Sequence, residues 1–140
     1  MREFRNLEGE VLFLNKKLFD FKIERGELIE HNIVCREHMP YEFRFDISEQ
    51  EAIMLFLDDR VLPETRIGLS EDLKKAGIPY FDMDMIIKRS NGFSLEDFYW
   101  VRFATGVQTW EDLVYQHFGK APENKNDYER LVKKPKEYGQ

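Results

Sequence analysis

The spacing of hydrophobic residues changes at Ser48, and this change restricts the possible folds more than any other feature of the chain. Before Ser48, apolar and polar residues alternate, most clearly in residues 19–23 and 41–47. After Ser48, apolar residues recur every three or four positions, beginning with residues 53–61. Alternation indicates half-buried strands, and the wider spacing indicates amphipathic helices. Strands followed by helices predict an α+β fold rather than a βαβ-wound sheet.

The N-terminal part is predicted to form an antiparallel β-meander of about four strands. The expected strands are residues 10–14, 19–23, 28–34 and 41–47. Short loops separate the first three strands, and Gly26 can supply the positive φ that a tight turn needs. Because short connections favour antiparallel neighbours, we expect a sheet with one buried face and one face in water.

Three to five short helices are predicted to follow and to pack on one face of the sheet. Ser48 heads a capping box at the start of the first helix. Gly77 predicts the left-handed end of a second helix over residues 69–76. Asp82 is a suitable N-cap for a third helix over residues 83–90. A further helix is expected near the end of the domain.

An extra extended segment is predicted near residues 98–103, packed on the helices. The elements before residue 120 are expected to form a single α+β domain, residues 1–119. Residues 120–140 are predicted to be a weakly structured C-terminal tail with at most a short helix over residues 128–133.

Composition is that of a soluble globular protein. Of the 140 residues, 42% are hydrophobic and 34% are charged, and no apolar run approaches the ~18 residues of a membrane span. The N-terminus lacks the apolar stretch of a secretory signal. A single cysteine cannot form an internal disulfide. We therefore expect a cytoplasmic protein that does not contact a membrane.

The net charge of −6 argues against nucleic acid as a partner, because phosphate contacts need clustered lysine and arginine. The acidic part is residues 42–97, with thirteen acidic and seven basic residues. This part could attract a basic partner or imitate a nucleic acid, or it could simply be a solvated surface.

Two chemical sites can be considered around the single cysteine. His31, Cys35 and His38 could supply three ligands for zinc, but no fourth ligand lies nearby and the spacing matches no standard finger. Cys35 with His38 or His117 could form a thiolate–imidazole pair, but no family motif surrounds the cysteine. We expect neither a bound metal nor a cofactor.

Paired carboxylates could serve a small metal-dependent enzyme, because two-metal sites need several converging carboxylates. The pairs are Asp58-Asp59, Asp82 with Asp84, and Glu96-Asp97. Helix capping explains Asp82 and the helix dipole explains Asp84. The glycines are scattered singly, which excludes a glycine-rich phosphate loop. We expect no catalytic residues.

Residues 69–76 and 83–90 loosely suggest a helix-turn-helix, which makes a DNA-binding transcriptional regulator one alternative. The second helix would present Lys88 and Arg89. Its first turn, which should meet base edges, carries Asp82 and Asp84 instead. Their charges repel phosphate, so this alternative is weak.

Residues 92–103 contain five aromatic side chains, which can either join two layers of a fold or form a recognition surface. In an extended segment, Tyr99, Val101 and Phe103 share one face, and we expect this apolar face to meet the core. The opposite face is the expected partner surface. The predicted partner-binding residues are Tyr99, Trp100, Arg102 and Trp110.

A series of residues in the second half of the chain resembles small uncharacterised proteins of Gram-positive bacteria and their mobile elements. The series is Leu57, Arg60, Leu62-Pro63, Thr65-Arg66, Leu73, Gly77-Ile78, Tyr80 and the run GFSLEDFYWV at residues 92–101. Some of these proteins are similar to segments that accompany HipA-like kinases, in which a Gly-x-Ser-Leu-x-Asp-x-Tyr-Trp pattern recurs. The kinase's ATP-binding and catalytic motifs are missing from this sequence. The resemblance therefore implies an accessory or regulatory role and assigns no site residue.

Together these features predict a non-catalytic protein-binding or regulatory module of a bacterium or mobile element, with a protein partner. A more specific alternative is an anti-CRISPR-type inhibitor of a defence nuclease, in which the acidic surface would compete with nucleic acid for a basic groove.

Overall fold

A computed structural model describes residues 3–61, 68–78 and 80–118 of the chain. The strands are β1 (Leu7–Phe13), β2 (Lys16–Glu24), β3 (Glu27–Ile33) and β4 (Tyr99–Arg102). The helices are the 3₁₀-helix η1 (Tyr41–Arg44), α1 (Glu49–Asp59), α2 (Leu69–Lys75), α3 (Met83–Ser90) and α4 (Trp110–Phe118). The predicted tail, residues 120–140 with its short helix over 128–133, lies outside the described residues.

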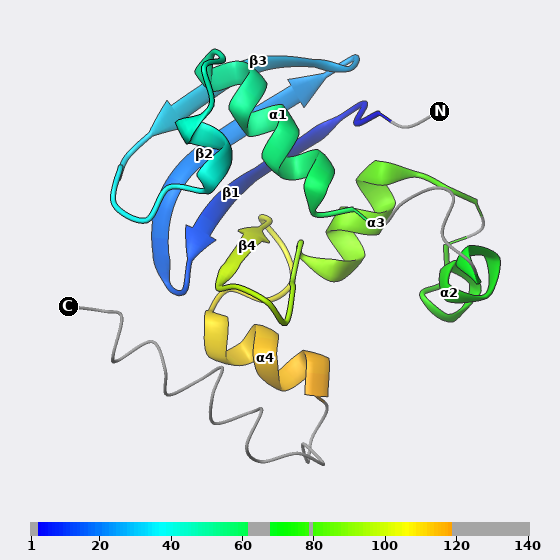
Figure 1. Cartoon of the computed structure of the whole chain (residues 1–140). Helices are drawn as coiled ribbons and strands as arrows, with labels where there is room; N and C mark the ends of the chain where they lie inside the picture. The colour runs from blue at the N-terminus through cyan, green and yellow to red at the C-terminus, as the bar shows by residue number, and fades with distance from the viewer. Residues whose placement is uncertain (1–2, 62–67, 79, 119–140) are drawn as a thin grey trace.

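The described strands form a four-stranded antiparallel sheet in the order β3-β2-β1-β4 (Figure 1). β1, β2 and β3 are the predicted meander, joined by tight turns. β4 comes from much later in the chain and pairs with the free edge of β1, where Val11 lies opposite Val101. Because the sheet is N-terminal apart from β4 and the helices follow, the predicted α+β class is confirmed.

The fourth strand of the sheet is β4, so the prediction of a strand at residues 41–47 was wrong. The first four residues of that segment form η1, in which the Phe43 backbone N–H donates to the Pro40 carbonyl, and residues 45–47 are bends. The neighbouring edge strand β3 explains why no strand forms here, because its side chains are only half-buried or exposed. A strand added beside β3 would gain little burial, whereas β4 joins β1 at two fully buried positions, Trp100 and Val101.

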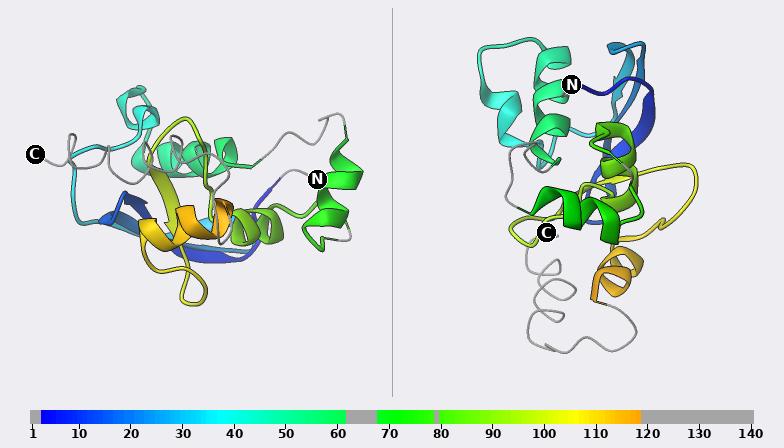
Figure 2. Two further views of the ribbon diagram at one scale, coloured as in Figure 1. Left: turned by 90° about the horizontal axis from the view of Figure 1, so that it is seen from below. Right: turned by 90° about the vertical axis from the view of Figure 1, so that its right-hand side faces the viewer.

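The main core lies between one face of the sheet and the helices α1 and α3, and Figure 2 shows α1 forming a layer over the sheet. Val11 and Val101 belong to this core. Leu12 and Trp100, their chain neighbours, point to the opposite face and pack with α4 in a smaller second cluster. The sequence predicted that the helices pack on one face of the sheet. In the structure, α4 lies instead on the opposite face, against β1 and β4.

The predicted helix starts are confirmed at two positions. The Ser48 hydroxyl accepts a hydrogen bond from the Glu51 backbone N–H at 3.1 Å at the start of α1. The Asp82 carboxylate accepts one from the Met85 backbone N–H at 3.1 Å at the start of α3. Each side chain satisfies one of the backbone donors left free in the first turn of a helix.

Candidate protein-binding site

The two tryptophans predicted to meet a partner are part of the core. Trp100 and Trp110 are 0% and 1% exposed, and the Trp100 indole N–H donates to the Leu14 carbonyl at 2.6 Å. Trp100 does lie on the strand face opposite Val101, but α4 covers that face. The expectation that these two side chains form a recognition surface was therefore wrong.

Tyr99 and Arg102 are half-buried and make contacts within the chain. The Tyr99 hydroxyl donates to the His38 carbonyl, and burial raises the pKa of Tyr99 to about 12. The expected core face of β4 is confirmed, since Tyr99 and Phe103 pack against the main core that contains Val101.

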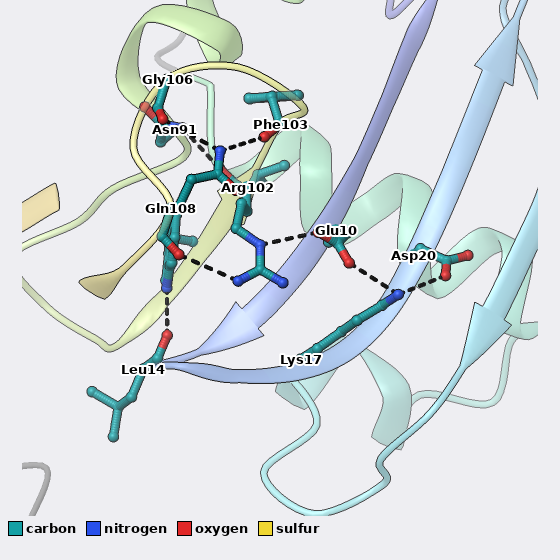
Figure 3. Close-up of polar contacts among 11 residues, drawn as sticks. Glu10, Leu14, Lys17, Asp20, Asn91, Arg102, Phe103, Gly106 and Gln108 are labelled. Atoms are coloured by element: carbon teal, nitrogen blue, oxygen red, sulfur yellow. Dashed lines mark hydrogen bonds and ion pairs between the residues drawn. The ribbon is translucent and has the colours of Figure 1, made fainter. Parts of the chain in front are cut away.

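Arg102 belongs to a charged row on the outer face of the sheet (Figure 3). Its guanidinium donates to Glu10 at 3.0 Å and to the Gln108 carbonyl at 3.2 Å. Lys17 joins the same Glu10 to Asp20, each at 3.0 Å. These charge pairs across the strands explain the presence of Arg102 at this position without any contact to a partner protein.

Arg60, the residue just after α1, binds the segment of residues 92–100 that carries the Gly-x-Ser-Leu-x-Asp-x-Tyr-Trp pattern. The Arg60 guanidinium pairs with both Asp97 oxygens at 2.6 and 2.8 Å, and it donates to the Gly92 and Tyr99 carbonyls at 2.8 and 2.9 Å. Its side chain is 9% exposed. The Ser94 hydroxyl accepts from the Glu96 backbone N–H. The run therefore builds a loop around one buried arginine.

The predicted metal ligands have other neighbours. His31 Nε2 lies 3.6 Å from a Glu49 oxygen, and the His38 ring stacks on Phe13 with centroids 4.4 Å apart. Within residues 3–61, 68–78 and 80–118, no group of three or more histidine, cysteine or acidic side chains could hold a metal ion. The histidine–cysteine and paired-carboxylate sites are thus not assembled in this part of the chain.

The carboxylates at the start of α3 are occupied by backbone donors. Asp82 caps the helix, and Asp84 accepts from the Arg5 and Asn6 backbone N–H groups at 3.0–3.3 Å. These bonds attach the N-terminal segment to the helix. The first turn of α3 is therefore part of the fold, where a recognition helix would need free side chains.

Exposed apolar side chains gather instead in the segment that failed to form a strand. Tyr41, Phe45 and Ile47 are 60%, 44% and 37% exposed. The rings of Tyr41 and Phe45 touch, with centroids 5.5 Å apart. Grouped exposed apolar side chains on a single chain commonly mark a contact surface.

Phe45 and Ile47 line a groove of about 500 Å³ beside α1. Met54 and Leu55 of α1 form its other wall, and buried Met83 of α3 also lines it. Methionines adapt their shape to an apolar ligand because their side chains are unbranched and polarizable. We call this set of residues the α1 groove.

The rim of the α1 groove is acidic. Its polar lining residues are Glu3, Glu51 and Asp58. An apolar floor with carboxylates around it combines a surface for hydrophobic burial with a negative potential that favours cationic ligands. Sequence reasoning missed this site because alternation at residues 41–47 was interpreted as one buried strand face.

No helix of the described residues is both long and apolar enough to cross a membrane. Comparisons of the chain with models of known protein families, with curated proteins and with solved structures find no match.

Proposed function

We propose that this protein is a non-catalytic protein-binding module whose α1 groove takes a segment of a partner protein. The observation that carries the proposal is that Phe45 and Ile47, both large and exposed, line an apolar groove with carboxylates at its rim. Exposure of such side chains costs hydration free energy that a bound apolar group recovers.

The partner segment is expected to carry an apolar anchor with lysine or arginine beside it. The anchor would contact Phe45, Ile47 and Met54. The basic residues would face Glu3 and Glu51. Electrostatic complementarity of this kind speeds association and selects the partner, while apolar burial supplies most of the affinity.

A more specific form of the proposal is an inhibitor of a defence nuclease of the anti-CRISPR type. The acidic rim favours it, because nuclease surfaces that hold nucleic acid are basic. In that form the partner's basic groove would contact the rim and compete with its nucleic acid.

The test uses a display library of random twelve-residue peptides selected on the immobilised full-length protein. We expect enriched peptides to combine a large apolar residue with lysine or arginine. Phe45→Asp should weaken a selected peptide about tenfold or more, since burying a phenylalanine is worth about 1.5–3 kcal/mol. Fluorescence anisotropy of the labelled peptide gives the affinity.

Tyr115→Asp on α4 is the matched control, because Tyr115 is 45% exposed and Phe45 is 44% exposed. It should leave peptide binding unchanged. Glu51→Gln should weaken binding, and raising the salt concentration should weaken it in the same direction. Peptides that bind Phe45→Asp and Tyr115→Asp equally well would refute the proposed site.

A further inference from the structure

Glu42, on η1, is a carboxylic acid buried inside the protein without a complete set of partners. The residue is 2% exposed. Its Oε1 atom has no hydrogen-bond partner among the described residues. A buried polar atom left unpaired is costly, so such an atom in a native structure calls for a ligand, a water or a role.

Glu42 lines a cavity of about 300 Å³ between η1, α1 and β4. A second carboxylate, that of Asp59 at the end of α1, also lines it, as do the rings of Tyr41, Phe56 and Tyr99. Asp97, which pairs with Arg60, is a third carboxylate in the lining. Acids together with aromatic walls are the combination that binds organic cations through charge-assisted hydrogen bonds and ring faces.

The cation already at the cavity is not available to these acids. Arg60 uses its guanidinium on Asp97 and on the Gly92 and Tyr99 carbonyls. It also lies over the Phe56 ring, 5.5 Å from the centroid. Arg60 is ion-paired with Asp97, and within the described part of the chain neither Glu42 nor Asp59 forms an ion pair with a basic side chain.

We propose that the cavity between η1, α1 and β4 binds the guanidinium or primary ammonium end of a ligand, held by Glu42 and Asp59. Glu42 Oε1 accepts one N–H of the ligand. The rings of Tyr41 and Tyr99 border the cation. Tyr41 is 60% exposed, so its ring can move to admit the ligand. The site does not depend on the α1 groove, because the two are lined by different residues.

Titration of Glu42 gives the site a pH dependence. Burial, and then the neighbouring Asp59 carboxylate, raises the pKa of Glu42 to about 7. Asp59 on α1 and Tyr99 on β4 face it, and Arg60 opposes the shift. A cation binds the ionised acid, so binding should strengthen as the pH rises through about 7 and should release a proton.

The test titrates the full-length protein with butylguanidine and with N-acetyl-arginine amide, followed by two-dimensional amide NMR. We expect shifts at Glu42, Asp59 and Tyr99. Affinity should rise about tenfold between pH 6 and pH 8, because the ionised fraction of an acid with this pKa rises about that much. Tighter binding of N-acetyl-arginine amide than of butylguanidine would identify a protein side chain as the source of the cation.

Glu42→Gln keeps the shape and removes the charge. It should weaken both probes about tenfold or more and abolish the pH dependence. Asp59→Asn, at the more exposed position, is the second variant, and amide dispersion shows that each variant is folded. Glu51→Gln removes a charge from the same helix outside the cavity and should have no effect on these probes.

Two results would overturn the proposal. One is the lack of any shift with either probe at millimolar concentration. The other is binding that persists unchanged in Glu42→Gln. Because Glu51→Gln affects the α1 groove alone and Glu42→Gln affects the cavity alone, failure of one proposal leaves the other measurable.

Discussion

Replacing Arg60 with leucine should destabilise the fold more than any other single change of a charged residue among those the structure describes. Arg60 joins the end of α1 to both ends of the loop before β4. Its guanidinium makes four hydrogen bonds of 2.6–2.9 Å to Gly92, Asp97 and Tyr99. Leucine occupies part of the same space and makes none of them.

The expected loss of unfolding free energy is about 3 kcal/mol. Removing one member of a buried ion pair costs about 3–5 kcal/mol, because the other charge is left uncompensated. The Arg60 side chain is 9% exposed, but that of Asp97 is 34% exposed and can be partly rehydrated. The loss should therefore lie at the lower end of the range, which is still a large share of the ~5–15 kcal/mol that stabilises a typical domain.

Urea denaturation monitored by tryptophan fluorescence measures this loss, because Trp100 and Trp110 are both buried. With a typical m value of about 2 kcal/mol/M, the midpoint should fall by about 1.5 M. Adding Asp97→Asn to Arg60→Leu should show a coupling energy of about 1 kcal/mol or more between the two residues.

Arg102→Leu is the control for the effect of losing an arginine. The Arg102 side chain is 25% exposed and its pair with Glu10 lies on the outer face of the sheet. Partly solvated pairs contribute about 0.2–1 kcal/mol, so the midpoint should change little. The reasoning about Arg60 is refuted if Arg60→Leu costs less than about 1 kcal/mol or no more than Arg102→Leu.

Three further changes test other parts of the structure. Trp100→Ala should cost about 3–5 kcal/mol by urea denaturation, because it empties the second core cluster under α4. Asp84→Ala should speed hydrogen exchange at the Arg5 and Asn6 amides, which lose their acceptor, while exchange in the centre of the sheet stays slow. For Glu42, a folded pKa of about 7 against 4.5 in the unfolded chain means that the native state binds the extra proton between these values. The contribution of Glu42 to the free energy of unfolding therefore falls as the pH rises from about 4.5 to 7, and Glu42→Gln should flatten the pH dependence of stability in this range. At pH 8 the free energy of unfolding of this variant should be higher by up to about 3 kcal/mol.

Helix ends could be predicted from the sequence because their causes are local. Gly77 takes a φ of +76°, which glycine adopts at little cost. The Ile78 and Gly77 backbone N–H groups then donate to the Leu73 and Lys74 carbonyls at 2.8 and 3.0 Å. Both bonds close within six residues, so a Gly-Ile pair after an amphipathic run is enough to predict this helix end.

Residues 41–47 could not be predicted, because alternation leaves two outcomes open. The same spacing suits a strand and a short turn that buries one side and exposes the other. Whether residues 41–47 form a strand depends on which sheet edge is open to them, and the edge of β1 is paired with β4. The α1 groove is a consequence of this pairing. Because β4 is the strand beside β1, residues 41–47 stay outside the sheet, and Phe45 and Ile47 remain exposed.

Trp100 shows why residue type alone does not distinguish a recognition surface from a buried core position. Tryptophan is common at interfaces because it is large and has one polar atom, and the same properties suit a buried site where the indole N–H finds an acceptor. The Leu14 carbonyl supplies that acceptor. Whether α4 would cover the second face of β4 depends on Trp110 and Leu113, which lie beyond the aromatic run.

The pattern Gly-x-Ser-Leu-x-Asp-x-Tyr-Trp therefore carries information about architecture. Gly92 needs a φ of +62°, and an added Cβ would lie 3.3 Å from Val101 Cγ2. Asp97 binds Arg60 and also accepts from the Tyr99 backbone N–H at 3.1 Å. The bonds from Arg60 to Gly92, Asp97 and Tyr99 join the two ends of this loop, so a chain with the pattern and an equivalent of Arg60 should form the same loop, and one that lacks the arginine should not. Under the proposed function, the partner would therefore be selected outside the pattern, on the α1 groove, whose side chains can change without disturbing the loop.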